Sequence, residues 1–132
     1  MARKIDHKRN DATGRRAEDN VTAYLNALGY TILSRRLRTP YGEIDILALD
    51  KNTLVVIEVK ARASLETASE ALSSKQCRRL ERAILFFISQ NPDYNSYDIR
   101  FDLVWKIDHT IHHIPSAWMS MSSDLETQDF IF

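Results

Sequence analysis

The sequence predicts an α/β domain with a central mixed β-sheet flanked by helices, in the order α-β-β-β-α-β-β. Two observations support this. Apolar residues recur at helical spacing in two long segments, 12–28 and 75–90. Shorter runs of β-branched and aliphatic residues lie between and after these segments, bounded by turn residues. A helix, three strands, a second helix and one or two further strands are typical of helices packed on the faces of one sheet.

The first predicted helix spans residues 12–28, and Gly29 is a typical helix end. Three strands are expected next, at residues 30–39, 43–49 and 54–61. Pro40 and Gly42 give a turn signal between the first two strands. The segment 50–53, "DKNT", has the composition of a hairpin loop and joins the second strand to the third.

The second half of the chain begins with the predicted helix 75–90, which Asn91 and Pro92 end. The segment 97–107 alternates strictly, with apolar residues on one side and mostly charged residues on the other, which predicts a half-buried strand. The segment 109–114 is expected to form one more strand. A short helix or ordered loop is expected over residues 65–73.

The 132 residues suggest one domain at 12–118, preceded by a flexible basic arm at 1–11 and followed by a tail at 119–132. The formal net charge is zero, so bulk charge indicates neither a nucleic-acid nor a membrane partner. A single cysteine, Cys77, excludes an internal disulfide and a cysteine-rich zinc site. No apolar run reaches the length of a membrane span, and the cytoplasm is the expected compartment.

Four charges interrupt the apolar strands of the predicted hairpin: Glu43, Asp45, Glu58 and Lys60. If residues 50–53 form the whole loop, Leu49 pairs with Leu54. Counting back, Asp45 then stands opposite Glu58, and Glu43 stands opposite Lys60. Because side chains alternate along a strand, all four are expected on one face.

Two carboxylates on directly paired residues, with Cβ atoms about 4.5–5.5 Å apart, repel each other. A divalent cation such as Mg²⁺ or Mn²⁺ relieves this repulsion, because hard cations take carboxylate oxygens together with waters and substrate phosphates. The Lys60 ammonium on the same face would then lie beside a reacting phosphate. The alternative is a solvated cross-strand charge network.

Apolar residues on both faces of the hairpin favour a pocket over open solvent. One face is expected to carry Ile44, Ile46, Val55, Ile57 and Val59, and Leu47, Leu49, Leu54 and Val56 are expected to extend the charged face.

The segments "GRRAEDNVTAYLNALGY" at 14–30 and "GEIDILALDKNTLVVIEVKAR" at 42–62 resemble the YraN family of uncharacterised bacterial proteins. The resemblance covers roughly residues 14–118. That family is placed with the PD-(D/E)XK nuclease superfamily, near archaeal Holliday-junction resolvases. The resemblance implies a restriction-endonuclease-like core and a metal-dependent nuclease acting on DNA, with branched or structured DNA as one option.

The same resemblance implies roles for individual residues. Asp45, Glu58 and Lys60 match the Asp, Glu and Lys of the superfamily motif. Glu18 matches a first-helix glutamate that joins the metal site in resolvase-like members, and on base rates alone it reads as an ordinary rim residue. Gln76 matches a glutamine seen in some relatives. The backbone carbonyl of Val59 is expected as a further metal ligand, and Glu43 is expected to line the site.

Basic residues gather in two clusters. Lys75, Arg78, Arg79 and Arg82 share one helix face at three- and four-residue spacing, which favours them as phosphate contacts. Arg35, Arg36 and Arg38 are divided by strand alternation, with Arg35 on one face and the other two on the opposite face. Both clusters have a simpler reading as solvated surface.

Three histidines, His109, His112 and His113, are interpreted as ordinary strand-end residues rather than metal ligands, because alternation separates them and no supporting ligand pattern accompanies them.

The leading function that the charged hairpin and the resemblance indicate is a Mg²⁺- or Mn²⁺-dependent DNA nuclease. The alternatives are a nucleic-acid-binding protein without turnover and a purely structural protein. The sequence leaves the oligomeric state open, with a homodimer as one option.

Overall fold

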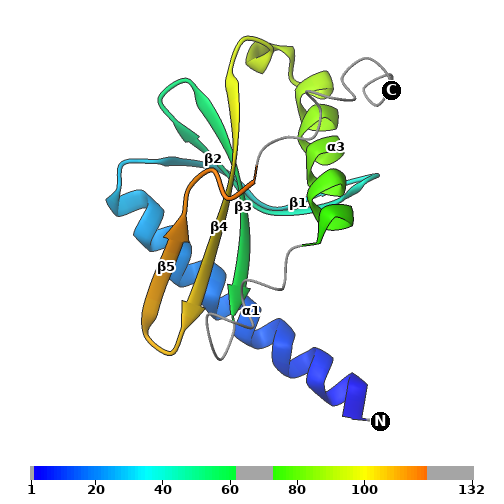
Figure 1. The fold of residues 1–132 in the computed structure, drawn as a ribbon, viewed down its shortest axis with the longest axis vertical. Coiled ribbons are helices and arrows are strands. Elements are labelled where there is room, and N and C mark those ends of the chain that lie inside the picture. The colour runs from blue at the N-terminus through cyan, green and yellow to red at the C-terminus, as the bar shows by residue number, and fades with distance from the viewer. Residues whose placement is uncertain (1, 62–72, 119–132) are drawn as a thin grey trace.

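A computed structural model describes the backbone of residues 2–61 and 73–118, with side chains from residue 15 onward in these ranges. The element bounds are α1 Ala2–Ala27, β1 Thr31–Thr39, β2 Gly42–Asp50, β3 Thr53–Ala61, α3 Ser74–Gln90, a 3₁₀ turn η1 Pro92–Tyr94, β4 Asp98–Ile107 and β5 Thr110–Ile114. The strands form one sheet in the order β1-β2-β3-β4-β5, in which only β3 and β4 are parallel (Figure 1). The predicted α/β order and mixed sheet are confirmed.

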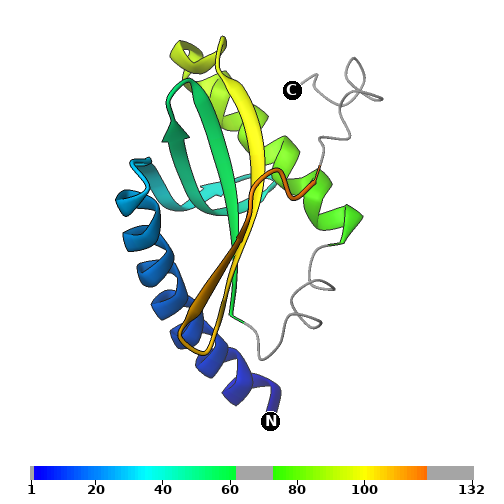
Figure 2. The same cartoon turned by 60° about the vertical axis from the view of Figure 1, so that its left-hand side comes forward.

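The two long helices lie on opposite faces of the sheet, which is seen nearly edge-on in Figure 2. On the α3 face the core joins Leu47, Leu54 and Val56 to Leu80 and Ile84. On the α1 face the core consists of other residues: Val21, Leu25, Ile46, Ala48, Val55, Ile57 and Val104. Burial of apolar surface on both faces is what fixes the helices against the strands.

Helix α1 begins at Ala2 rather than near residue 12, so the backbone of the predicted basic arm continues the helix. Its end is as predicted at Gly29, which adopts a φ of +94°. The Tyr30 N–H donates to the Leu25 carbonyl and the Gly29 N–H to the Asn26 carbonyl, both at 3.0 Å. This pattern satisfies the last carbonyls of the helix and requires the left-handed backbone that glycine adopts without strain.

The β2–β3 hairpin has the predicted register, with Leu49 paired to Leu54. The turn is shorter than expected, because Asp50 pairs with Thr53 and leaves only Lys51 and Asn52 as the loop. Regular pairing ends at Ile46–Ile57, one residue before Asp45 and Glu58. The two carboxylates therefore lie where the ladder opens.

Strand alternation breaks in β1 and β2 near this opening. Arg36 has a φ of +52°, in the left-handed region, so the regular extended backbone of β1 is interrupted at this residue. Ile44 and Leu37, which pair with each other, both pack on the α3 side, while Ile46 packs on the α1 side. The expectation that Ile44 shares a face with Ile46 was wrong, because strand alternation breaks at Asp45 between them.

Strand β4 is buried on both faces between Phe101 and Trp105, so the prediction of a half-buried strand was wrong. Helix α1 covers its charged side. Asp102 is fully buried there and accepts hydrogen bonds from Arg100, at 2.9 and 3.0 Å, and from the Ser116 N–H at 3.0 Å. Paired partners of this kind allow a charge to be buried.

His113 joins the same network, with Nε2 2.7 Å from Asp102 Oδ2 and Nδ1 2.9 Å from the Tyr24 hydroxyl. His112 lies on the other side of β5 and stacks on Trp105. The predicted separation of these two histidines is correct. The His113 side chain is only 10% exposed, and the residue is a structural partner of Asp102 rather than a simple strand-end residue.

Two sequence expectations fall outside the described residues: the short helix or loop, in its part at 65–72, and the tail at 119–132. Over the residues that the structure describes, no helix is both long and apolar enough to cross a membrane.

Candidate active site

Four of the predicted site residues come together where β2 and β3 separate. Asp45 comes from β2, Glu58 and Lys60 from β3, and Gln76 from the first turn of α3. Glu58 and Lys60 follow Leu54 and Val56 at two-residue spacing, so strand alternation turns them towards α3. The site is thus built between the sheet and the start of this helix.

Asp45 is held by the backbone of the neighbouring strand. The Val59 N–H donates a hydrogen bond of 2.8 Å to Asp45 Oδ2. Burial, and then the Glu58 carboxylate, raise the pKa of Asp45 to about 8, with a smaller effect of the same sign from Glu18 and an opposing one from the Val59 N–H. Asp45 and Glu58 are thus close enough to repel each other as anions. The contact at Asp45 involves the Val59 N–H, and the Val59 carbonyl stays a predicted ligand.

Glu58 is buried, with 6% of its surface exposed. Lys60 Nζ lies 3.0 Å from Glu58 Oε2, and the Gln76 side-chain amide donates a hydrogen bond to the same oxygen. The Lys60 side chain is itself only 16% exposed. These two donors orient the Glu58 carboxylate and leave its second oxygen, Oε1, outside both contacts.

Glu18 is buried on α1, at 6% exposure, rather than lying on the rim. Its Oε1 accepts a hydrogen bond of 3.1 Å from Arg36 Nε and lies 3.8 Å from Arg35 Nη2. Both arginines therefore reach the same carboxylate, which contradicts the expectation that they occupy opposite faces. The left-handed backbone at Arg36 brings its side chain round to Arg35.

Glu43 is exposed and lies near Arg38, with Oε2 3.9 Å from Arg38 Nε. The structure records no pairing of Glu43 with Lys60, whose contact is Glu58. The break in alternation at Asp45 separates Glu43 from the other three charges of the hairpin. The predicted opposition of Glu43 and Lys60 is therefore absent from the described ladder.

The donor set at Asp45 and Glu58 suits a hard divalent cation. Both are carboxylates and they lie close together, and burial and then the Glu58 charge raise the pKa of Asp45, so a bound cation would favour its ionised form. Within residues 15–61 and 73–118, no three His, Cys, Asp or Glu side chains are grouped tightly enough to enclose an ion by themselves. Two carboxylates fit a divalent cation such as Mg²⁺, which commonly takes one or two protein carboxylates and completes its shell with other oxygen ligands.

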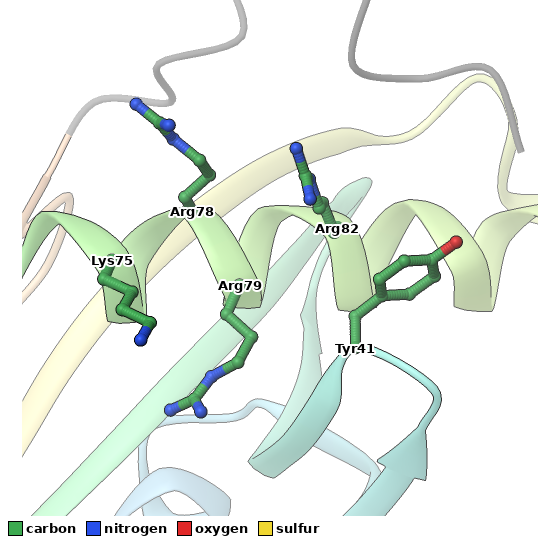
Figure 3. Close-up of a pocket in the computed structure, with 5 residues that line it drawn as sticks. All are labelled: Tyr41, Lys75, Arg78, Arg79 and Arg82. Carbon is green, nitrogen blue, oxygen red and sulfur yellow. The ribbon is translucent and has the colours of Figure 1, made fainter.

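The predicted basic face of α3 forms a pocket with the β1–β2 turn. Its volume is about 270 Å³, and it is lined by Tyr41, Lys75, Arg78, Arg79 and Arg82 (Figure 3). All four predicted phosphate-binding residues are thus on one surface. The other cluster is divided differently from the prediction, with Arg35 and Arg36 at Glu18 and Arg38 exposed beside Glu43.

Sequence reasoning missed three features of this region. Tyr41 lies in the predicted turn between the first two strands and was not predicted to be a site residue, although it lines the pocket together with the basic residues of α3. Arg36 was expected to contact phosphate or to be solvated, and it is instead hydrogen-bonded to Glu18. The charged side of β4 was expected to face solvent. Arg100 and Asp102 are two residues apart, so they share a face of the strand and can pair, as they do in the structure.

Comparison with known proteins identifies the relatives of this chain. A family model described as "Uncharacterised protein family UPF0102" matches residues 17–105, which include Glu18, Asp45, Glu58, Lys60 and Gln76. A UPF0102 protein of Rhodopseudomonas palustris (strain BisB5) is 42% identical over 107 residues, or 80% of this chain and 82% of the relative. One of Acidiphilium cryptum (strain JF-5) is 38% identical over 111 residues, or 84% and 87%.

A third relative, a UPF0102 protein of Nitrobacter winogradskyi, is 46% identical over 89 residues, or 67% of this chain and 75% of the relative. These matches confirm the resemblance to the YraN family, which is UPF0102. The chain belongs to the uncharacterised protein family UPF0102.

Proposed function

We propose that this protein is a metal-dependent nuclease that hydrolyses phosphodiester bonds in DNA. The observation that carries the proposal is the convergence of Asp45, Glu58 and Lys60 at the opening of the β2–β3 ladder. Two mutually repelling carboxylates beside a partly buried ammonium suit a divalent cation and a phosphate. A solvated charge network is disfavoured because Glu58 and Lys60 are largely withdrawn from solvent.

When bound, Mg²⁺ or Mn²⁺ would be held by Asp45 and Glu58, and would supply charge stabilisation at a phosphoryl oxygen and lower the pKa of a coordinated water. The Val59 N–H fixes the orientation of Asp45. Gln76 and Lys60 fix that of Glu58. Preorganised groups of this kind reduce the reorganisation needed in the transition state.

In the hydrolysis, the oxygen of water attacks phosphorus and gives up a proton, one phosphorus–oxygen ester bond breaks, and the departing oxygen takes up a proton in return. Negative charge grows on the phosphoryl oxygens as this happens. The Lys60 ammonium, 3.0 Å from Glu58 Oε2, is placed to stabilise that charge. Because it acts on charge that develops during the reaction, its main effect is on the rate rather than on DNA affinity.

The basic residues of α3 provide the grip on the DNA backbone in this proposal. Lys75 directly precedes Gln76, so the helix that contacts Glu58 also carries the cationic pocket. A phosphodiester chain lying along this face would pass from the pocket to the carboxylates. Cations that contact phosphates supply most of the sequence-independent affinity for DNA.

A DNA-binding protein without turnover is the second candidate. It is favoured by the pairing of Glu18 with Arg36, since the hydrogen bond of 3.1 Å engages an oxygen of the carboxylate that would be the third acidic ligand. Such a protein would use the cationic face of α3 in the same way. A protein that only binds DNA has no need for the cluster of Asp45, Glu58 and Lys60. The presence of this cluster is why the nuclease is preferred over the non-catalytic candidate.

The test is a cleavage assay with purified protein on linear, flapped and four-way DNA and on matched RNA, with Mg²⁺, Mn²⁺ or chelator. We expect metal-dependent cleavage of at least one DNA substrate, lost in Asp45→Asn and Glu58→Gln variants. Glu43→Gln is the matched control, since Glu43 is an exposed carboxylate two residues from Asp45 on the same strand.

Two results would contradict the catalytic proposal. Metal-independent binding without cleavage of any substrate would support the second candidate. Cleavage that persists unchanged in both carboxylate variants would show contamination by another nuclease. If only the RNA substrates are cleaved, the protein is a ribonuclease and the proposal that it acts on DNA is wrong.

A further inference from the structure

The pocket on α3 contains an aromatic ring, which contacts with the phosphate backbone of DNA alone would not require. It is lined by one aromatic ring, Tyr41, and by four basic side chains, and none of these five residues is acidic. Figure 3 shows Arg78 and Arg82 projecting to one side of the helix and Lys75 and Arg79 to the other, with the Tyr41 ring alongside Arg82. The pocket therefore offers a flat apolar surface bordered by positive charge.

Tyr41 is positioned by a contact of its ring and by the close approach of the next residue to α3. Tyr41 packs edge-on against Phe86 of α3, with ring centroids 6.2 Å apart. The next residue, Gly42, has a φ of +137°, and a Cβ built on it would lie 3.1 Å from Cγ and Cδ of Arg79. The β1–β2 turn thus meets the helix closely through a glycine. Tyr41 is a positioned wall of the pocket rather than a loose loop residue.

This chemistry suits a nucleotide. Aromatic side chains stack on nucleobases, and guanidinium groups bind phosphate through directed hydrogen bonds. The volume of about 270 Å³ lies just below the range of about 300–1,000 Å³ typical of small-molecule sites, so it suits one nucleotide and not a length of duplex.

Pairing in the nucleic acid decides which nucleotide can enter. In a continuous duplex the bases are stacked inside the helix, and taking one out costs unstacking and unpairing energy. Phosphate contacts need no such opening, but contact between Tyr41 and a base does. An occupant of this pocket is therefore a nucleotide that is already unpaired, as in a flap, bulge or branch point.

The pocket lies close to the candidate active site. Gln76, which contacts Glu58, is on the same helix as the lining residues, and Arg82 is six residues further on. At the rise of an α-helix, this separation is about 9 Å. A nucleotide in the pocket and a phosphate at Asp45 and Glu58 can belong to one strand.

We propose that the Tyr41 pocket binds one unpaired nucleotide of the substrate, with its base against Tyr41 and its phosphate on the arginines, and so selects branched or interrupted DNA over continuous duplex. This inference rests on the proposed nucleic-acid substrate and adds its structural preference.

The test measures binding rather than cleavage. Fluorescence anisotropy with the full chain, in chelator, compares a continuous duplex with the same duplex carrying two unpaired thymidines. We expect the wild-type protein to prefer the interrupted duplex by about tenfold. Tyr41→Leu, which keeps apolar volume but removes the ring, should bring this ratio close to one, and Tyr41→Phe should retain it.

Tyr97→Leu is the matched control. Tyr97 is a half-buried tyrosine that packs on Tyr94 beyond the C-terminal end of α3. It is expected to keep the wild-type ratio, and thermal melting reports the folding of every variant. The inference is overturned if the wild-type protein shows no preference or no DNA binding, if Tyr41→Leu keeps the ratio, or if Tyr97→Leu lowers it equally.

The two proposals can fail separately. Cleavage that depends on Lys60 but shows no Tyr41-dependent preference would remove this inference alone. A Tyr41-dependent preference without cleavage of any substrate would remove catalysis and retain the pocket in a DNA-binding protein.

Discussion

Lys60 and Glu58, two residues apart on β3, form an ion pair of 3.0 Å that is largely buried between the sheet and α3. Residues at this spacing share a face of a strand, so the sequence itself places them together. The helix adds Gln76 to the same Glu58 oxygen. Burying a charge pair costs desolvation free energy, so such a pair is weak evidence for a role in stability alone. The role of Lys60 in catalysis is therefore tested directly.

Lys60→Ala is expected to lower the cleavage rate by about a hundredfold or more while changing DNA affinity less than about threefold, because its charge acts on the transition state. Single-turnover cleavage and anisotropy measure the two effects. Lys106→Ala is the control: Lys106 follows Trp105 on β4, beside Ala61, and alternation turns it to the opposite face. Cleavage at the wild-type rate would exclude this role for Lys60.

Magnesium is expected to stabilise the folded protein through Asp45. At a concentration about tenfold above the dissociation constant, binding to the folded state alone adds about 1.4 kcal/mol, which raises the melting temperature by about 5 °C. Asp45→Asn should abolish this rise, and Glu43→Gln should keep it. An equal rise in wild-type and Asp45→Asn proteins would place the ion elsewhere.

Stability without metal is expected to depend on pH through Asp45. Burial and Glu58 raise the pKa of Asp45 to about 8, from 3.8, so the folded protein binds the proton more tightly than the unfolded chain. The contribution is fully present below about pH 4 and is lost as the pH rises to about 8. In chelator, the wild-type melting temperature should therefore fall over this window relative to that of Asp45→Asn. Parallel curves for the two proteins would contradict this assignment.

The cationic face of α3 is expected to set the salt dependence of DNA binding. Replacing Arg78, Arg79 and Arg82 with alanine should reduce the slope of log affinity against log salt, by about one where they share the phosphate of a single nucleotide and by about three where each contacts its own phosphate. Lys51→Gln is the control, because Lys51 is an exposed lysine in the β2–β3 turn, at the other end of β2 from Asp45. An unchanged slope in the triple variant would show that DNA approaches another surface.

The Asp102 network is expected to matter for stability and not for the site chemistry. Burial acts to raise the pKa of Asp102, but His113, Arg100 and the Ser116 N–H outweigh it, so the pKa is lowered. Asp102→Ala leaves Arg100 without its main partner and should cost about 3 kcal/mol in urea denaturation. Asp50→Ala, which removes the more exposed partner of Arg100 at 3.2 Å, should cost less than about 1 kcal/mol.

The sequence by itself determined the elements and their order, because apolar periodicity and turn residues are local signals. It determined the hairpin register, because the turn segment 50–53 sets which residues of the two strands pair, Leu49 with Leu54. It also determined that Glu58 and Lys60 share a face of β3, since this follows from strand alternation, and it placed Asp45 next to them at the end of the paired hairpin.

Only the tertiary structure decided what depends on packing between distant segments. The left-handed backbone at Arg36 turned Arg36 towards Glu18, and the break in alternation at Asp45 separated Glu43 from Lys60. Neither irregularity has a signal in the local sequence pattern. Helix α1 covered β4 and buried Asp102. The approach of the β1–β2 turn to α3 set Tyr41 among the arginines. These relationships join residues far apart in the chain, so the free energy that selects them arises only when the helices pack on the sheet.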